Sequence, residues 1–271
     1  MRNFYILVRY LGRRHRLVLA LLAAWTFAAS WVFAWMTSQA GLREGITKLL
    51  KILPVKLQDS MGGDMAMLMD PTGFLVLGFD HPLLSVPFMF WALLLPLRHL
   101  ASEQERGLLD VVLVRPVSRT AWLGAILFWQ IIGLLIIAFA AAFSMALGCG
   151  YYVELQSVHH DVLYGYALMQ ALWAFAIGGV TAVIAAKVGR FRQALGGAIA
   201  FTLITILWEV LCRSIKLWKP YIILSLRHWA EPHTLFPSGW NATGAVVLIA
   251  TAACAWVVAV IFFKRHDLGA N

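Results

Sequence analysis

The residues in this sequence that could do chemistry are few, and most of them lie inside or beside long apolar stretches. Asp80 and Glu209 are carboxylates within such stretches. A carboxylate inside a membrane-spanning segment is a candidate for relaying protons or ions, because a charge is costly to keep in hydrocarbon. Arg213 follows Glu209 at helical spacing, where the two side chains can form an ion pair. We favour this structural interpretation of Glu209. The alternative is an ion-coupled secondary transporter or channel that uses Asp80 and Glu209.

Two clusters carry side chains of the kinds that bind metal ions. His159, His160 and Asp161 are consecutive, but neighbouring residues on a helix point to different faces, which disfavours a shared ion. Met61–Met69 contains four methionines, whose thioethers suit soft Cu(I). Methionine is also an ordinary filler of apolar surfaces. We therefore predict no metal site on this chain and leave the role of the methionine cluster open.

Motifs that would make the chain an enzyme are missing from the sequence. A P-loop needs G-x-x-x-x-G-K-[ST] to hold phosphates, and no glycine here is followed by lysine. The metalloprotease motif H-E-x-x-H and the nucleophile elbow G-x-S-x-G are also missing. We expect no catalytic residues and no cofactor on this chain, and any energy from ATP must come through another subunit.

The segment from Leu100 to Arg119 is the most informative part of the chain. Acidic residues come first, an apolar run over 108–114 follows, and R-P-V-S-R closes the segment at 115–119. A solvated loop would explain the charges but not the ordered apolar run. A short helix that docks its apolar face into a groove on a partner explains that run. Its acidic residues would pair with basic residues of the partner and set the register.

The composition excludes most classes of water-soluble protein. Of the 271 residues, 61% are hydrophobic and only 13% are charged, against roughly 45–50% and about 25% in a soluble globular chain. This leaves too little polar surface for a soluble enzyme, and it also excludes a disordered chain or a disulfide-rich secreted domain. The net charge of +9 is explained by orientation in a membrane, so we expect no nucleic-acid partner.

Six apolar stretches are long enough to cross a bilayer, which takes about 20 residues per helix. The first is too long for the core of a signal peptide, so we expect it to be retained. The sequence therefore predicts an all-α polytopic membrane protein with a single transmembrane domain, 1–271. The predicted spans are approximately 17–37, 74–97, 121–147, 162–186, 194–212 and 242–263.

Positive charge predicts the orientation of these spans. The side that holds both termini carries 14 lysines and arginines and the other side 8, so both termini are expected in the cytoplasm. Residues 2–16 place arginines on one helical face and apolar residues on the other, which predicts an interfacial helix that leads into the first span. A row of small residues in the fourth span would let another helix approach closely. That row is Ala174, Gly178, Ala182 and Ala186.

The segment after the second span resembles a known family. The sequences E-Q-E-R-G-L-L-D at 103–110 and P-V-S-R at 116–119 are similar to E-x-E-x-G-T-L-x-x-L-L-x-x-P-V-S-R, which the membrane subunits of ABC-2 type ABC transporters carry between their second and third helices. Leu108 stands where the family commonly has threonine. The stretch 262–268 also resembles the family's F-x-R-R-D-L tail. The specific match covers about twenty residues, although the six-span layout also fits.

The resemblance implies a function and a set of partners. Two such membrane subunits pair, as a homodimer or a heterodimer, and two separate ATPase subunits that bind ATP and Mg dock below them. Substrate export from the cell across the inner membrane is implied by the family alone, and the substrate cannot be read from the sequence. The segment after the second helix would be the coupling helix seated on the ATPase. The residues this assigns to coupling are Glu103, Glu105, Arg106, Gly107, Asp110, Arg115, Pro116 and Arg119.

Overall fold

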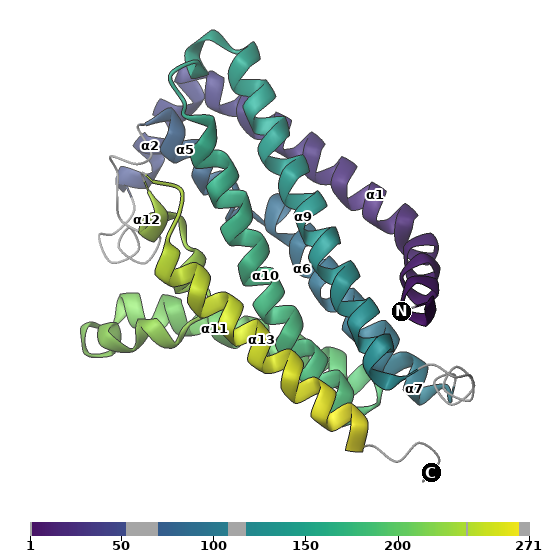
Figure 1. The fold of residues 1–271 in the computed structure, drawn as a ribbon. Helices are drawn as coiled ribbons and strands as arrows, with labels where there is room; N and C mark the ends of the chain where they lie inside the picture. The colour runs from purple at the N-terminus through teal and green to yellow at the C-terminus, as the bar shows by residue number, and fades with distance from the viewer. Residues whose placement is uncertain (1, 53–69, 108–117, 237, 266–271) are drawn as a thin grey trace.

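The computed structural model is a bundle of long helices (Figure 1). It describes residues 2–52, 70–107, 118–236 and 238–265. The described residues are 89% helical, and no strand occurs within these ranges. Six of the helical segments are long and apolar enough to cross a membrane. The predicted all-α class with six spanning segments is therefore confirmed.

The long helices account for the six spans, and short helices connect them. The elements are α1 (Arg2–Ser38), α2 (Ala40–Ile52), α5 (Pro71–Gly78), α6 (Pro82–Pro96), the π-helix η1 (Leu97–Ser102), α7 (Glu103–Glu105), α9 (Arg119–Tyr151), η2 (Val153–Leu155), α10 (His160–Val188), α11 (Phe191–Ser214), η3 (Lys216–Leu224), η4 (His228–Ala230), α12 (Pro232–Leu235) and α13 (Ala242–Arg265).

The second span is built from two helices that meet at a break, where the sequence predicts an irregular entry to a span over 74–97. Phe79, Asp80 and His81 separate α5 from α6. Pro82 occupies the first turn of α6, where its missing N–H costs nothing. The ring of His81 caps that helix by accepting a hydrogen bond from the Leu83 N–H at 3.3 Å. The chain then continues without interruption through α6, η1 and α7.

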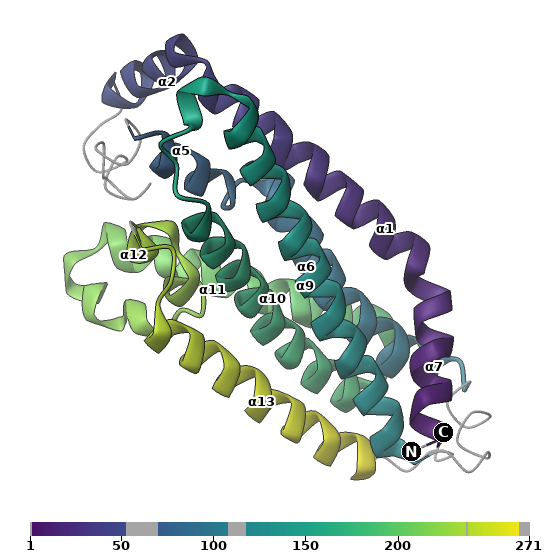
Figure 2. The same ribbon diagram turned by 45° about the horizontal axis from the view of Figure 1, so that its top comes forward.

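The first helix is longer than a span requires. With 37 residues, α1 measures about 55 Å at 1.5 Å per residue, whereas the hydrocarbon core is about 30 Å thick. The helix bends near its N-terminal end (Figure 2). Residues 2–16 are thus part of the same helix as the first span, and the placement of this part in a membrane interface stays a prediction.

The apolar stripe of the N-terminal part of α1 packs against protein. Leu7 and Leu11 are buried in the core of the bundle. The indole N–H of Trp129, on α9, donates a hydrogen bond of 2.7 Å to the Val8 carbonyl. A Cβ on Gly12 would overlap the Trp129 ring, so a glycine at this position lets α1 lie close to α9. The amphipathic pattern of this segment is therefore satisfied, at least in part, by α9.

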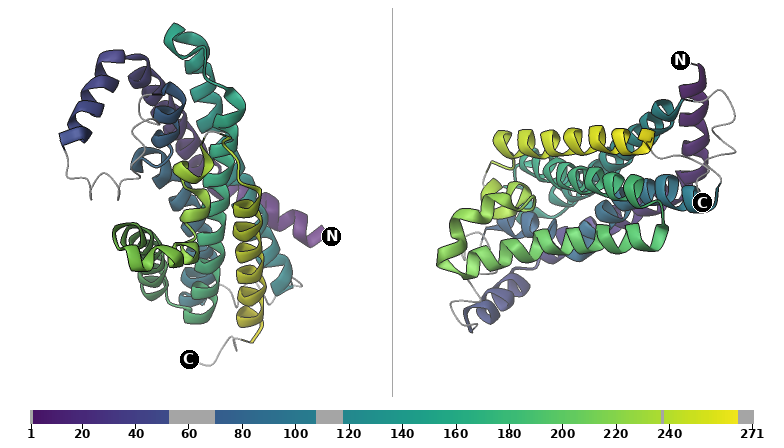
Figure 3. Two further views of the ribbon diagram at one scale, coloured as in Figure 1. Left: turned by 90° about the vertical axis from the view of Figure 1, so that its left-hand side faces the viewer. Right: turned by 90° about the horizontal axis from the view of Figure 1, so that it is seen from below.

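Helix α10 lies at the centre of the bundle, with α11 and α13 on opposite sides of it (Figure 3). The small-residue row Ala174, Gly178, Ala182 and Ala186 is buried along this helix. A Cβ on Gly178 would overlap the side-chain amide of Gln130 and lie 3.0 Å from the Ala92 carbonyl oxygen. Gly178, the glycine of this row, thus lets α10 approach α6 and α9 closely.

The outer faces of the bundle are apolar, as the lipid-facing surface of a membrane protein must be. Large hydrophobic side chains point outward from α1, α11 and α13. Examples that are more than two-fifths exposed are Leu17, Leu21, Trp25, Leu203, Ile204, Leu207, Val246, Ile249 and Val257. Together with six helices long and apolar enough to cross a membrane, this surface is compatible with a multi-pass membrane protein.

The N-terminal end of α1, the short helix α7 and the C-terminal end of α13 lie at one end of the bundle (Figure 1). Helices α2, α5 and α12 lie at the other end. Both ends of the described chain thus lie at the same end of the bundle, and the side of a membrane that this end faces stays a prediction. We refer to the first end as the α7 end.

Candidate functional site

The candidate site is the α7 end of the bundle, where the predicted coupling segment leaves the second span and enters the third. Glu103 is buried there, although the sequence assigns it to a partner contact. Its carboxylate pairs with Arg14 of α1 at 2.7 Å. The same oxygen lies 2.9 Å from Nδ1 of His99, one helical turn earlier. Glu103 therefore joins the start of the segment to α1 inside this chain.

A second histidine extends this network into the protein. Nε2 of His15 lies 2.7 Å from Nε2 of His99, and both rings are buried. Because a carboxylate only accepts, Nδ1–H of His99 donates to Glu103, and in the neutral ring Nε2 of His99 then accepts from His15. Nδ1 of His15 then lacks a hydrogen-bond partner among the described residues. The result is a chain of polar contacts that fixes α1 against η1.

Glu105 connects the segment to a different helix. Its Oε2 accepts a hydrogen bond of 2.9 Å from the backbone N–H of Phe191, the first residue of α11. A carboxylate at a helix N-terminus satisfies an orphan N–H and is favoured by the helix dipole. Next to it, the side chain of Gln104 packs against Gly189, which ends α10 in the left-handed conformation.

Gly107 follows α7 and its C-cap Arg106, as the last described residue before 118. Its φ is +66°, and its N–H donates to the Gln104 carbonyl at 3.0 Å. This left-handed conformation costs a residue with a Cβ about 1–2 kcal/mol, so glycine is the suitable residue here. The neighbouring Arg106 is exposed. The glycine of the motif thus has a structural role in the turn.

The far end of the segment is attached to the last helix. One guanidinium nitrogen of Arg119 donates to the carbonyls of Phe263 and Lys264, at 3.1 and 3.0 Å. These carbonyls belong to the last turn of α13, where α13 itself offers no N–H to bond them. Ser118 caps α9 by accepting from the Ala121 N–H at 3.1 Å, so this helix starts at Arg119, two residues before the predicted span.

The described ends of the predicted coupling segment therefore contact α1, α11 and α13, helices that are far apart in the sequence. Arg106 and Gly107 lie at its exposed margin. Asp110, Arg115 and Pro116, which the family resemblance also assigns to coupling, lie outside the described residues. So does the apolar run over 108–114.

No known protein family and no curated protein matches this chain. The assignment of a function therefore depends on the geometry of the site and on the sequence pattern.

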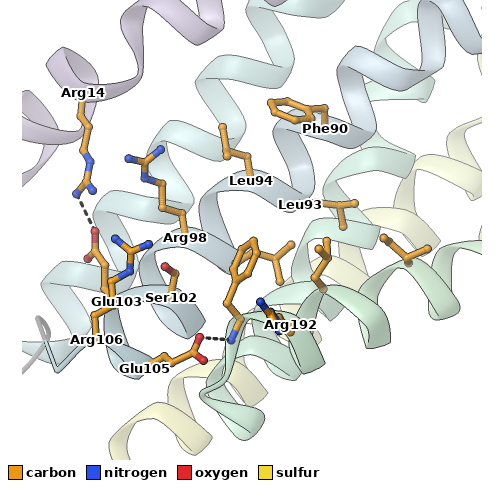
Figure 4. Close-up of a pocket in the computed structure, with 14 residues that line it drawn as sticks. Arg14, Phe90, Leu93, Leu94, Arg98, Ser102, Glu103, Glu105, Arg106 and Arg192 are labelled. Carbon is orange, nitrogen blue, oxygen red and sulfur yellow. Dashed lines mark hydrogen bonds and ion pairs between the residues drawn. The ribbon is translucent and has the colours of Figure 1, made fainter.

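A cleft of about 840 Å³ opens beside this network, between α6–η1–α7 and the first half of α11 (Figure 4). Its inner wall is apolar and its margin is charged. The charged and polar lining residues are Arg14, Arg98, Ser102, Glu103, Glu105, Arg106 and Arg192, and the apolar ones are Phe90, Leu93, Leu94, Leu97, Phe191, Leu195 and Ile199.

The residues of the alternative function lie near the opposite end of the bundle, and both are paired with arginine. Asp80 forms an ion pair with Arg227. The guanidinium of Arg227 also donates to Gln170 at 3.3 Å and lies over the Trp173 ring at 4.6 Å from its centroid. Glu209 pairs with Arg213 at 3.1 Å, which confirms the ion pair predicted from their spacing.

Arg213 also pairs with Glu231, so a small ionic network joins α11 to the segment before α12. Burial and the nearby Arg213 lower the pKa of His228, which favours its neutral form. Three carboxylates and two arginines meet in this part of the structure. Their mutual pairing explains why charged side chains are tolerated there.

Within the described ranges, no three His, Cys, Asp or Glu side chains lie close enough to hold a metal ion. This holds for the cluster His159, His160 and Asp161 as well. Met61, Met65 and Met67 lie outside the described residues, as does Met69.

Sequence reasoning did not identify Arg14, His15 or His99 as site residues. Arg14 was counted only as a positive charge for orientation, and the two histidines lie within helical stretches that show no motif. The positions of His99 and Glu103 four residues apart indicate a helical pair, but no sequence signal connects them with residues 14 and 15.

Proposed function

We propose that this chain is the membrane subunit of an ABC-2 type ABC transporter, which exports a substrate with energy from ATP hydrolysed on a separate subunit. Two copies of that ATPase, each with ATP and Mg, would dock at the α7 end. A second membrane subunit, identical or different, would complete the complex. On this proposal the protein lies in the inner membrane with the α7 end and both termini in the cytoplasm.

One observation carries this proposal: the described ends of the 103–119 segment are bonded to three other helices. Glu103 contacts α1 through Arg14, Glu105 contacts α11 through the Phe191 N–H, and Arg119 contacts the end of α13. A loop that only connects two spans needs none of these contacts. A segment that passes force from a docked partner into the membrane domain needs all of them, because coupling travels through contiguous packed and bonded groups.

The mechanism is a shift between two states of the bundle. Closure of the ATPase pair on ATP would move the two coupling segments of the complex together. Their contacts would pass this movement to α1, α11 and α13, which changes the side of the membrane to which the path between the subunits opens. ATP can drive the change only because its binding favours one of the two states.

The test is a charge reversal at the coupling segment. Glu105→Arg removes the acceptor of the Phe191 N–H and places a positive charge at the N-terminus of α11, where the helix dipole disfavours it. We expect the variant to insert into the membrane normally but to lose ATPase binding or to hydrolyse ATP without transport. Membrane insertion is checked by fractionation and ATPase binding by co-purification.

Two variants control this experiment. Glu105→Gln keeps an acceptor for the Phe191 N–H and should retain most of the coupling. Glu44→Arg reverses an exposed charge on α2, at the other end of the bundle, and should have no effect. Normal binding and transport in Glu105→Arg would contradict the proposal. Transport by the chain without any ATPase, lost in Asp80→Asn or Glu209→Gln, would instead establish the ion-coupled alternative.

A further inference from the structure

The cleft at the α7 end separates charged from apolar side chains along its length. The charged ones gather toward α7 and the N-terminus of α11, and Phe90, Leu93 and Leu94 line the part that extends along α6 (Figure 4). From α11, Leu195 and Ile199 complete the apolar wall. Because α6 and α11 belong to spanning segments, this wall lies along the direction of lipid acyl chains.

The charged margin has an excess of arginine. Arg14 is paired with Glu103, and Glu105 is engaged by the Phe191 N–H. Among the described residues, no carboxylate lies within 4.0 Å of the guanidinium groups of the three other lining arginines. These are Arg98, Arg106 and Arg192.

Three guanidinium groups that line one cleft without a carboxylate partner are a matched set of hydrogen-bond donors for a phosphate. The planar fork of arginine binds phosphate oxygens through two parallel N–H bonds, and it is weakly hydrated enough to do so at a membrane boundary. A free phosphate would use only this margin. The adjoining apolar wall adds favourable area only for a ligand that also has an aliphatic chain.

We propose that this cleft binds one membrane amphiphile with an anionic phosphate head group, which the arginines of the margin hold while its acyl chain lies against the apolar wall. The ligand enters from the leaflet on the α7 side. This proposal concerns the chain alone and does not depend on the ATPase partner, so that each can fail without the other.

The experiment measures lipid binding to the full-length chain in detergent micelles by native mass spectrometry. The probes are phosphatidylglycerol, phosphatidylcholine with the same acyl chains, and glycerol 3-phosphate, which has the anion but no chain. We expect the first phosphatidylglycerol molecule that binds to have a dissociation constant at least about tenfold lower than that of phosphatidylcholine. One additional charge-assisted hydrogen bond contributes enough binding free energy for a tenfold difference. Glycerol 3-phosphate should not displace it at equal concentration.

Three variants test the location. Arg98→Gln together with Arg192→Gln should weaken phosphatidylglycerol binding by about tenfold or more and leave phosphatidylcholine binding unchanged. Ile199→Trp should fill the apolar wall and weaken the binding of phosphatidylglycerol without changing any charge. Arg190→Gln is the matched control, since Arg190 is an exposed neighbour on the same helix end that does not line the cleft.

The outcomes that would overturn the proposal are specific. Equal binding of the two lipids, or full phosphatidylglycerol affinity in the double arginine variant, would show that the cleft does not select an anionic head group. An equal loss in Arg190→Gln would point to general surface charge. Tight binding of glycerol 3-phosphate would show a site for soluble anions instead. Circular dichroism and size exclusion confirm that each variant is folded.

Discussion

Glu103 and Arg14 form an ion pair of 2.7 Å across 89 positions of sequence. The pair joins the start of the predicted coupling segment to the first helix of the bundle. Through His99 and His15 it continues into the protein, between α1 and η1. The first helix and the segment after the second span are therefore held together at the α7 end, where a docked partner would act on both.

The first prediction concerns this ion pair. Glu103→Ala should lower the free energy of unfolding by about 1–3 kcal/mol, because it leaves the buried His99, and the partly exposed Arg14 beside it, without their carboxylate acceptor. The measurement is the thermal unfolding midpoint of the purified chain in detergent. Glu154→Ala, which removes an exposed carboxylate from η2, is the control and should change little. Equal midpoints for the two variants would contradict the role of the pair.

The second prediction concerns the turn at Gly107. Gly107→Ala should destabilise the protein by about 1–2 kcal/mol, because alanine is strained at a φ of +66°. Gly196→Ala is a matched control in α11, where a Cβ meets nothing within 4 Å and alanine should stabilise the helix by about 0.5–1 kcal/mol. The two variants should therefore shift the unfolding midpoint in opposite directions, and a shift in the same direction would refute this reading of the turn.

The third prediction concerns the close packing of α10. Gly178→Ala should cost about 1–3 kcal/mol, because the new methyl group would overlap the Gln130 amide and press on the Ala92 carbonyl. Gly150→Ala, near the end of α9 and free of neighbours within 4 Å, should cost nothing comparable. Unfolding in detergent measures both. A neutral Gly178→Ala would mean that the small residue is not required for this helix contact.

The fourth prediction concerns the ionic network near the opposite end. Because Asp80 and Glu209 are each paired with arginine, we expect Asp80→Asn and Glu209→Gln to reduce stability by about 1–3 kcal/mol and to leave ATP-driven transport largely intact. Transport in proteoliposomes with the ATPase and unfolding of the chain separate the two effects. Loss of transport with unchanged stability would assign these carboxylates to a relay.

Sequence patterns predicted those parts of the structure that depend on local or averaged properties. Hydropathy located six spanning segments, and helical spacing located the Glu209–Arg213 pair. The predicted helix ends are less accurate, because caps extend the helices beyond the apolar core. Ser118 caps α9, which therefore starts at Arg119, two residues before the predicted span. The capping serine was visible in the sequence and could have been used.

The contacts of the site could not be predicted in this way. Nothing in the spacing of Arg14 and Glu103 indicates that they meet, since their approach depends on how α1 packs against α9 and η1. The same holds for Arg119, whose guanidinium lies at the end of α13. The sequence marked these residues as charges near membrane ends, and only the packing of the bundle shows what they bond.

The central claim is that this chain works with a separate ATPase docked at the α7 end. The most direct measurement is to solubilise a tagged full-length chain from its native membrane, purify it and identify what remains bound. The account predicts an ATP-hydrolysing subunit with a Walker A motif, which Glu44→Arg keeps and which Glu105→Arg either loses or binds without driving transport. A purified chain that transports its substrate with no such subunit present would contradict it.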